Sequence, residues 1–150
     1  MQINGTYTMN APRQQVFDTL MNTESIRNCL PGCQKFDSLG EGRYEVSLRA
    51  GVAGVKGNFT GIITLQNPSP PESYTLLMEG NFSGGFVSGR SEIALEEDGQ
   101  KTRVSYRGEA QVSGPLASVG QRLMQPAAKM VTGQFFKCME AQLKQQGVSS

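Results

Sequence analysis

Residues 104–144 read VSYRGEAQVSGPLASVGQRLMQPAAKMVTGQFFKCMEAQLK, and the spacing of their apolar residues changes at Pro115. Before Pro115, apolar and polar residues alternate, as in a strand with one buried face. After it, apolar residues recur at intervals of three and four, as in a helix that buries one side. We therefore expect a long helix from about Pro115 to Lys144. Its expected buried side consists of Leu116, Val119, Gly120, Leu123, Ala127, Met130, Val131, Phe135, Cys138 and Met139.

The chain before Pro115 is dominated by alternating, strand-like segments. The first covers residues 3–9, and Pro12 then starts a stretch with helical spacing of apolar residues. Thr23 is positioned to cap a second short helix through Ile26, and residues 30–32 (LPG) are expected to end it. Further strands are expected at residues 33–39, 43–52, 55–66, 74–82, 87–95 and 104–112. Short turns join these strands, so neighbouring strands are expected to be antiparallel.

This order of elements predicts an α+β fold. The long helix has one apolar surface to cover, which is the inner face of a curved antiparallel sheet of about seven strands. Two short helices are expected after the first strand. The chain shows no internal repeat and no linker, so residues 1–150 are interpreted as one domain with a short polar tail from about residue 145.

Composition excludes several classes of protein. The chain has 14 basic and 13 acidic residues without a basic cluster, which argues against nucleic-acid binding. No apolar run approaches the ~20 residues of a membrane-spanning helix, and residues 1–5 do not resemble a signal peptide. We therefore expect a cytoplasmic protein in which Cys29, Cys33 and Cys138 are thiols.

The two faces of the predicted sheet differ in chemistry. Charged residues fall on the outer face, and inner positions are aliphatic, aromatic or glycine. The chain has no histidine, and no pair of carboxylates is expected inside, so no catalytic residue is predicted. Cys29 and Cys33 form only a weak metal motif, and Cys138 is interpreted as a small apolar filler, so no metal site is predicted.

Glycine recurs at inner positions of the strands, at Gly57, Gly61, Gly80, Gly89 and Gly108. Glycine in a strand permits strong curvature and leaves space, so we interpret the interior as an apolar cavity. The alternative is a fully packed core in which the glycines only bend the strands. The residues expected to line the cavity and its opening are Leu48, Val52, Phe59, Ile63, Met78, Phe82, Val87, Leu116, Leu123, Ala127 and Met130.

Successive turns of an antiparallel meander alternate between the two ends of a sheet. The turns expected at one end are acidic or rich in proline, whereas those at the other end are uncharged and rich in glycine. The second group comprises residues 30–32, 51–54, 83–85 and 113–115. We interpret this end as an apolar mouth that opens to a ligand, a membrane surface or a partner. The alternative is that these glycines only form tight hairpins.

Three motifs resemble the carbon monoxide dehydrogenase G-subunit family. They are residues 28–33 (NCLPGC), residues 54–61 (GVKGNFTG) and residues 114–123 (GPLASVGQRL), with Phe135 and Phe136 downstream. The resemblance covers nearly the whole chain. It implies the helix-grip fold of the START-like, polyketide-cyclase-like superfamily.

The same resemblance implies a non-catalytic accessory protein of a molybdenum-containing carbon monoxide dehydrogenase or a related molybdenum hydroxylase. In that family the role is linked to membrane recruitment of the enzyme and to quinone handling. The implied ligand is an isoprenoid quinone or a similar apolar molecule, with no tightly bound cofactor, and the implied location is the inner face of the cell membrane. Family members often carry a C-terminal extension, whereas this sequence ends at Ser150, so only transient membrane contact is expected.

Two other hypotheses remain open at this point. One is a small cavity enzyme of the cyclase or hydrolase type, and the other is a pure assembly factor without a ligand. An enzyme requires an ionisable group inside the cavity, whereas an assembly factor binds no small molecule.

Overall fold

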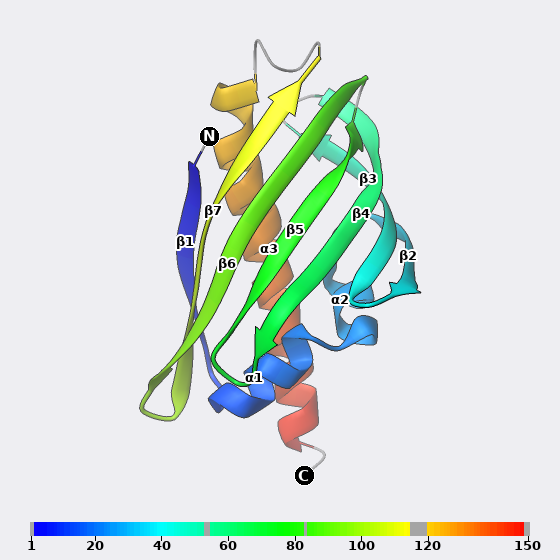
Figure 1. Cartoon of the computed structure of the whole chain (residues 1–150). Helices are drawn as coiled ribbons and strands as arrows, with labels where there is room; N and C mark the ends of the chain where they lie inside the picture. The colour runs from blue at the N-terminus through cyan, green and yellow to red at the C-terminus, as the bar shows by residue number, and fades with distance from the viewer. Residues whose placement is uncertain (1, 53–54, 83, 115–119, 149–150) are drawn as a thin grey trace.

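A curved antiparallel sheet wraps one long helix, and two short helices lie at one end of the molecule (Figure 1). The structure is a computed structural model that describes residues 2–52, 55–82, 84–114 and 120–148. It describes the backbone alone for residues 50–52, 55–56, 120–128 and 145–148. In chain order the elements are β1 (Gln2–Met9), α1 (Arg13–Leu20), α2 (Thr23–Cys29), β2 (Cys33–Gly40), β3 (Arg43–Val52), β4 (Val55–Ser69), β5 (Ser73–Phe82), β6 (Gly85–Asp98), β7 (Lys101–Ser113) and α3 (Gly120–Val148).

The strands form one seven-stranded sheet in the order β1-β7-β6-β5-β4-β3-β2, and every neighbouring pair is antiparallel. The expected meander from β2 to β7 is confirmed. β1 pairs with β7 at the far edge, because α1 and α2 carry the chain across one end of the sheet before β2 begins (Figure 1). Exposure alternates along β1 from Gln2 to Met9, which confirms the predicted half-buried strand. The fold is therefore the predicted α+β helix-grip arrangement.

The short helices form where the apolar spacing predicts them, although the cap of α2 differs. α2 runs through Ile26 to Cys29 and ends at residues 30–32, as predicted. The predicted cap at Thr23 is wrong by one residue, because the side chain of Asn22 accepts a hydrogen bond from the Ser25 backbone N–H at 3.0 Å. An amide oxygen at this position satisfies a donor that the first turn of a helix leaves unpaired.

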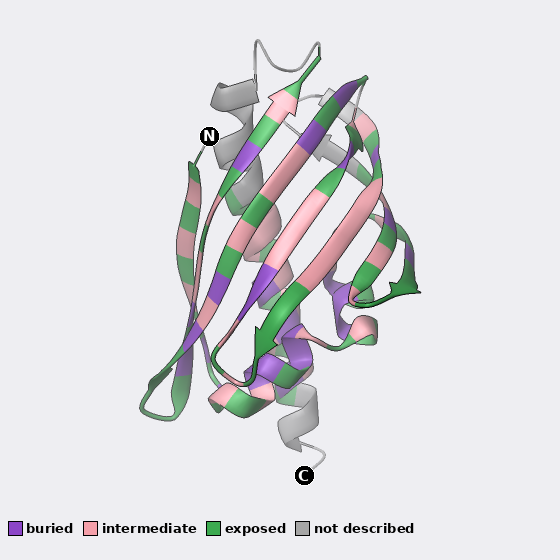
Figure 2. Ribbon diagram, in the orientation of Figure 1, coloured by how far each residue is buried: buried purple, intermediate pink, exposed green. Residues whose placement is uncertain are grey.

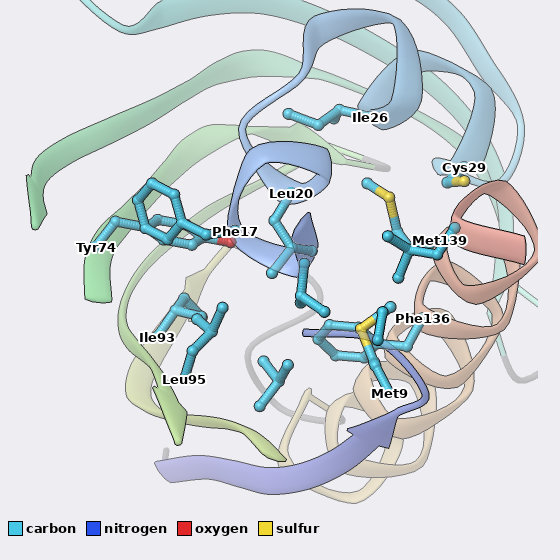
Figure 3. Close-up of a cluster of buried hydrophobic side chains, with 14 of the residues drawn as sticks. Met9, Phe17, Leu20, Ile26, Cys29, Tyr74, Ile93, Leu95, Phe136 and Met139 are labelled. Carbon is cyan, nitrogen blue, oxygen red and sulfur yellow. The ribbon is translucent and has the colours of Figure 1, made fainter. Parts of the chain in front are cut away.

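The hydrophobic core fills the end of the sheet that is covered by α1, α2 and the C-terminal half of α3 (Figure 3). The hydroxyl of Thr102 is fully buried there and donates to the Ala11 carbonyl at 2.7 Å, so its polar group is satisfied. The strands contribute Met9, Phe36, Val46, Tyr74, Ile93, Leu95 and Val104 to this core. The helices contribute Val16, Phe17, Leu20, Ile26, Cys29, Phe136, Met139 and Leu143.

The C-terminal half of α3 packs into the core. Met139 is 0% exposed, and Phe136 and Leu143 are almost as fully buried. The ring of Phe136 also stacks on that of Tyr7 in β1, with ring centroids 5.3 Å apart. The burial of Met139 confirms its place on the predicted buried side. Because these contacts lie near one end of α3, the core fixes this half of the helix to the sheet and to α2.

The limits of α3 differ from those predicted. The helix ends at Val148 rather than near Lys144, and the expected first residues 115–119 lie outside the described residues.

The prediction that Met130 is buried is wrong, because its side chain is 47% exposed. Met130 falls on the same side of α3 as Gln134, Lys137 and Ala141, and all three of these are exposed. Apolar residues lie on both sides of this helix, so spacing alone did not identify the buried side.

Cys29 of α2 and Cys138 of α3 form a disulfide, with their Cα atoms 5.3 Å apart. The expectation of three thiols is therefore wrong for this pair, and Cys33 is the free cysteine. The bonded residues are 109 positions apart, and the packing of α2 against α3 brings them together. Across the same contact, the hydroxyl of Ser25 donates to the side-chain oxygen of Gln142 at 3.2 Å.

Met139→Ala is expected to lower the free energy of unfolding by about 2–5 kcal/mol, because it leaves a cavity in the core. Met130→Ala removes the same atoms from an exposed position and is expected to change it by less than about 0.5 kcal/mol. Urea unfolding measures both variants. Equal losses of unfolding free energy in the two variants would contradict the orientation of α3 described above.

Burial raises the pKa of the Tyr74 hydroxyl above its ordinary value of 10.0. Because the hydroxyl ionises at lower pH in the unfolded chain, Tyr74 contributes its full stabilisation below about pH 10 and loses it as the pH rises further. Tyr74→Phe is therefore expected to reduce the loss of unfolding free energy above about pH 10. Urea titrations at several alkaline pH values test this, and an unchanged pH slope in the variant would contradict it.

Candidate functional site

The described strand residues of the predicted cavity lie next to one another on the inner face of the sheet. Residues directly opposite in antiparallel strands place their side chains on the same face. The opposed pairs are Leu48–Phe59, Phe59–Phe82, Ile63–Met78 and Gly80–Val87. These residues form a continuous apolar surface across β3, β4, β5 and β6, which we call the inner apolar surface.

The inner apolar surface extends beyond the core. Phe59 and Val87 are buried at 8% and 5% exposure, yet neither belongs to the main cluster of core residues. Leu48, Ile63, Met78 and Phe82 are half-buried, and the first two of these also pack against the core. Figure 2 shows this intermediate burial along the middle of β4 and β5. Half-buried apolar side chains on a concave face suit the binding of an apolar molecule.

Gly61 and Gly80 lie directly opposite each other in β4 and β5. A Cβ atom on Gly61 would collide with the carbonyl oxygen of Glu79, and one on Gly80 would lie 2.8 Å from Cζ of Phe59. The backbones approach so closely here that only glycine fits without a shift of the strands. At this pair the glycines therefore allow β4 and β5 to bend toward each other. The ring of Phe59 covers the space above Gly80.

Gly89 in β6 has different surroundings. A Cβ atom there would lie 3.4 Å from the Glu109 carbonyl oxygen and 3.8 Å from Cβ of Ala110, which are ordinary contacts. Gly89 lies opposite Met78, so it belongs to the same face as the inner apolar surface. It is a position where a methyl group can be added without moving the backbone.

A polar contact that the sequence analysis missed lies on the inner side of the sheet. The Tyr7 hydroxyl of β1 donates to the carboxylate of Glu140 in α3 at 3.2 Å. Burial, followed by the charge and the hydrogen bond of Glu140, raises the pKa of the Tyr7 hydroxyl. The available signal was spacing, because Glu140 follows the buried Phe136 by four residues and so lies on the same side of the helix.

The charged strand residues lie on the outer face, as predicted. Arg90, Glu92, Arg107 and Glu109 are exposed there, and Arg90 pairs with Glu92 at 3.1 Å. Within the described parts of the chain, no three Cys, Asp or Glu side chains gather as a metal site. None of the described helices is long and apolar enough to cross a membrane. The inner face therefore offers apolar contacts and hydrogen-bonding groups at its β1 side.

An open depression of about 470 Å³ lies at the end of the sheet opposite the glycine-rich turns. Met21, Tyr44 and Leu65 supply apolar lining, and Glu41 and Asn67 supply polar lining. The sequence predicts a solvated rim here. The open form and mixed lining agree with a surface recess rather than an enclosed ligand site.

The remaining candidate residues belong to the turns and to α3. Leu116 lies outside the described residues, as do the side chains of Val52, Leu123 and Ala127. Their roles in lining a cavity stay predictions. Met130 is described, and its side chain projects from the exposed side of α3 rather than joining the inner apolar surface.

Comparison with protein families identifies the chain. The CoxG family, described as the G subunit of carbon monoxide dehydrogenase, matches residues 5–144, which is nearly the whole sequence. The chain belongs to the CoxG family. A comparison with curated proteins gives no match.

Solved structures share the fold of this CoxG-family protein. A conserved protein from Geobacillus kaustophilus is 30% identical, with a TM-score of 0.91 over 97% of this chain and 96% of the other. Zhui aromatase/cyclase from Streptomyces sp. R1128 is 14% identical, with a TM-score of 0.67 over 97% and 94% of the two chains. A START superfamily protein from Mycobacterium smegmatis is 13% identical, with a TM-score of 0.66 over 97% and 98%. The last two likenesses establish the START-like fold alone.

The two kinds of glycine predict different responses to the same substitution. Gly61→Ala is expected to lower the free energy of unfolding by about 1–3 kcal/mol, because the new methyl group meets the backbone of β5. Gly89→Ala is expected to be neutral or to raise it by up to about 1 kcal/mol, since alanine restricts the unfolded chain. Denaturant unfolding compares the two. A larger loss of unfolding free energy in Gly89→Ala than in Gly61→Ala would contradict the conclusion that close backbone approach requires glycine at Gly61 and not at Gly89.

Proposed function

We propose that this CoxG-family protein is a non-catalytic accessory protein that holds an apolar, quinone-like lipid between α3 and the inner apolar surface. The observation that supports this proposal is the position of that surface. It is continuous across four strands, extends from Leu48 and Ile63, which pack against the core, to residues outside the core, and is half-buried at Leu48, Ile63, Met78 and Phe82. The partner, on the basis of family membership, is a molybdenum-containing carbon monoxide dehydrogenase or a related molybdenum hydroxylase.

The chemistry of the surface favours an isoprenoid tail. Removing apolar ligand area from water contributes roughly 25 cal/mol per Å², so a long tail against these side chains gains several kcal/mol. Strand charges on the outer face do not oppose this burial. A quinone head is a hydrogen-bond acceptor and needs few polar groups, which fits an interior without a metal site in its described parts.

The glycine-rich end of the sheet is the proposed side of ligand access and of transient contact with the inner face of the cell membrane. Phe86, next to the β5–β6 turn, is 44% exposed. Gly114, after β7, packs against the same turn, because a Cβ atom on it would lie 3.0 Å from the Cα atom of Gly85. An exposed ring beside uncharged turns loses little on approaching lipid, and glycine turns have few side-chain contacts to break.

The Tyr7–Glu140 contact favours a second candidate function, a small cavity enzyme of the cyclase or hydrolase type. Tyr7 and Glu140 form an ionisable pair on the inner side, and an aromatase/cyclase shares the fold at low identity. Assays of ester, lactone and polyketide-type substrates with wild type and Tyr7→Phe separate the two functions. Turnover that disappears in Tyr7→Phe would replace the carrier proposal with the enzyme.

Titration with a short-chain isoprenoid quinone tests the carrier proposal directly. Wild type is expected to bind it, and Gly89→Leu is expected to weaken binding about ten-fold or more by filling the inner face, a change of about 1.4 kcal/mol. Ser88→Leu adds the same side chain to the outer face and is the matched control with unchanged binding. Gly61→Leu is unsuitable as a blocking variant, because its Cβ atom meets the backbone of β5.

Thermal melting of each variant accompanies the titration. Equal quinone affinity of wild type and a well-folded Gly89→Leu variant would place the ligand elsewhere. Failure of wild type to bind any quinone would leave the assembly factor as the better explanation.

A further inference from the structure

We propose that Cys29 and Cys138 are a reversible redox site that fixes α3 against α2 when oxidised and releases this tie when reduced. Their Cα separation of 5.3 Å lies within the range that a disulfide bridges. The proposed place of action, at the inner face of the cell membrane, rests on the proposed function. That face of the membrane borders the cytoplasm, which is reducing, and disulfides there are usually transient and redox-sensing rather than permanent.

The surroundings of the pair determine which sulfur a reductant reaches. Cys29 is 4% exposed, whereas Cys138 is half-buried on the side of α3 that faces α2. A thiolate of an external dithiol therefore attacks Sγ of Cys138. The S–S bond breaks, and its electron pair leaves on Sγ of Cys29, which takes up a proton.

The second thiol of the reductant completes the exchange. It attacks the mixed disulfide, becomes part of the reductant's own disulfide, and releases the Cys138 thiol after protonation. The dithiol thus supplies two electrons and two protons, and the protein gains two thiols. Burial raises the pKa of the Cys33 thiol, so this third cysteine is a weak nucleophile and is not needed for the exchange.

The fold survives reduction because other contacts hold α3. Phe136, Met139 and Leu143 stay buried in the core, and Tyr7 holds Glu140 from the opposite side of the helix. What reduction removes is the covalent tie to α2, leaving the Ser25–Gln142 hydrogen bond and apolar packing across that contact. Since α3 lies across the inner face of the sheet, loosening its fixed half is expected to speed release of a ligand held beneath it (Figure 1).

The first test counts thiols and measures melting in the full chain. When thiols are counted after denaturation, air-oxidised protein is expected to show one, and protein first reduced with dithiothreitol is expected to show all three. Reduction is expected to lower the melting temperature by about 5–15 °C, because the bond closes a loop of more than a hundred residues. Cys138→Ser is expected to melt at the lower temperature, and dithiothreitol is expected to leave its melting temperature unchanged.

Cys33→Ser is the matched control, since it removes a thiol without touching the pair. It is expected to keep the full melting shift. Three reactive thiols in air-oxidised wild type, or loss of the melting shift in Cys33→Ser, would overturn the assignment of the redox pair.

The second test measures release of a short-chain isoprenoid quinone from wild type and Cys138→Ser without reductant, because dithiols reduce quinones. Release is expected to be about five-fold faster or more in the variant. Equal release rates would overturn the coupling between the redox site and the ligand. If neither protein binds the quinone while the thiol and melting results hold, the proposed function fails and the redox tie stands.

Discussion

The packing of α3 against the core supports the rest of this structure. Phe136, Met139 and Leu143 insert into the end of the sheet, where α1 and α2 complete the enclosure. The same half of the helix is also held on both flanks. Tyr7 of β1 hydrogen-bonds Glu140 on one flank, and α2 holds the other through the disulfide and the Ser25–Gln142 hydrogen bond. The described contacts that hold this helix therefore gather at its C-terminal half.

The inner face is consequently divided along its length. Near α1 and α2 the strands bury Val46, Ile93, Leu95 and Val104 completely or almost so, and these residues stabilise the fold. Farther along, the same strands carry the inner apolar surface, whose members are mostly half-buried. A side chain that is only partly covered contributes less to stability than one in the core. Such a surface can exchange its contacts with solvent for contacts with a ligand at a small cost to the fold.

Local patterns in the sequence predict most of the fold. The change of spacing at Pro115 marks the boundary between β7 and α3, and alternation along β1 and β3–β7 assigns each residue to a face. Both patterns depend on neighbours within a few residues, so a single sequence contains them. Met130 is an exception, because its spacing predicts burial and its side chain is exposed. Where a helix has apolar residues on several sides, only the position of the sheet decides which side is buried.

Contacts between distant segments could not be predicted in the same way. The Cys29–Cys138 pair joins residues 109 positions apart, and its two members belong to helices whose mutual packing no local pattern specifies. The Tyr7–Glu140 contact has the same origin, since it joins the first strand to the last helix. Of the predicted ligand-contacting residues, the strand members Leu48, Phe59 and Met78 reach a common face because the alternation that places them is local.

The glycines on the inner face of the sheet differ in their surroundings. One interpretation took them as the source of a cavity, and the other took them as hinges in a packed core. Gly61 and Gly80 follow the second, because the backbones of β4 and β5 approach each other closely and the Phe59 ring covers the gap. Gly89 differs, because an added Cβ atom meets only ordinary contacts there, so no close approach of backbones requires this glycine. The close approach at one pair belongs to the curvature of the sheet around α3, and Gly89 on the neighbouring strand lies on the same face as that pair. The two sites are therefore separable, because a substitution at Gly89 adds a side chain to the inner face without disturbing the close approach of β4 and β5 at Gly61 and Gly80.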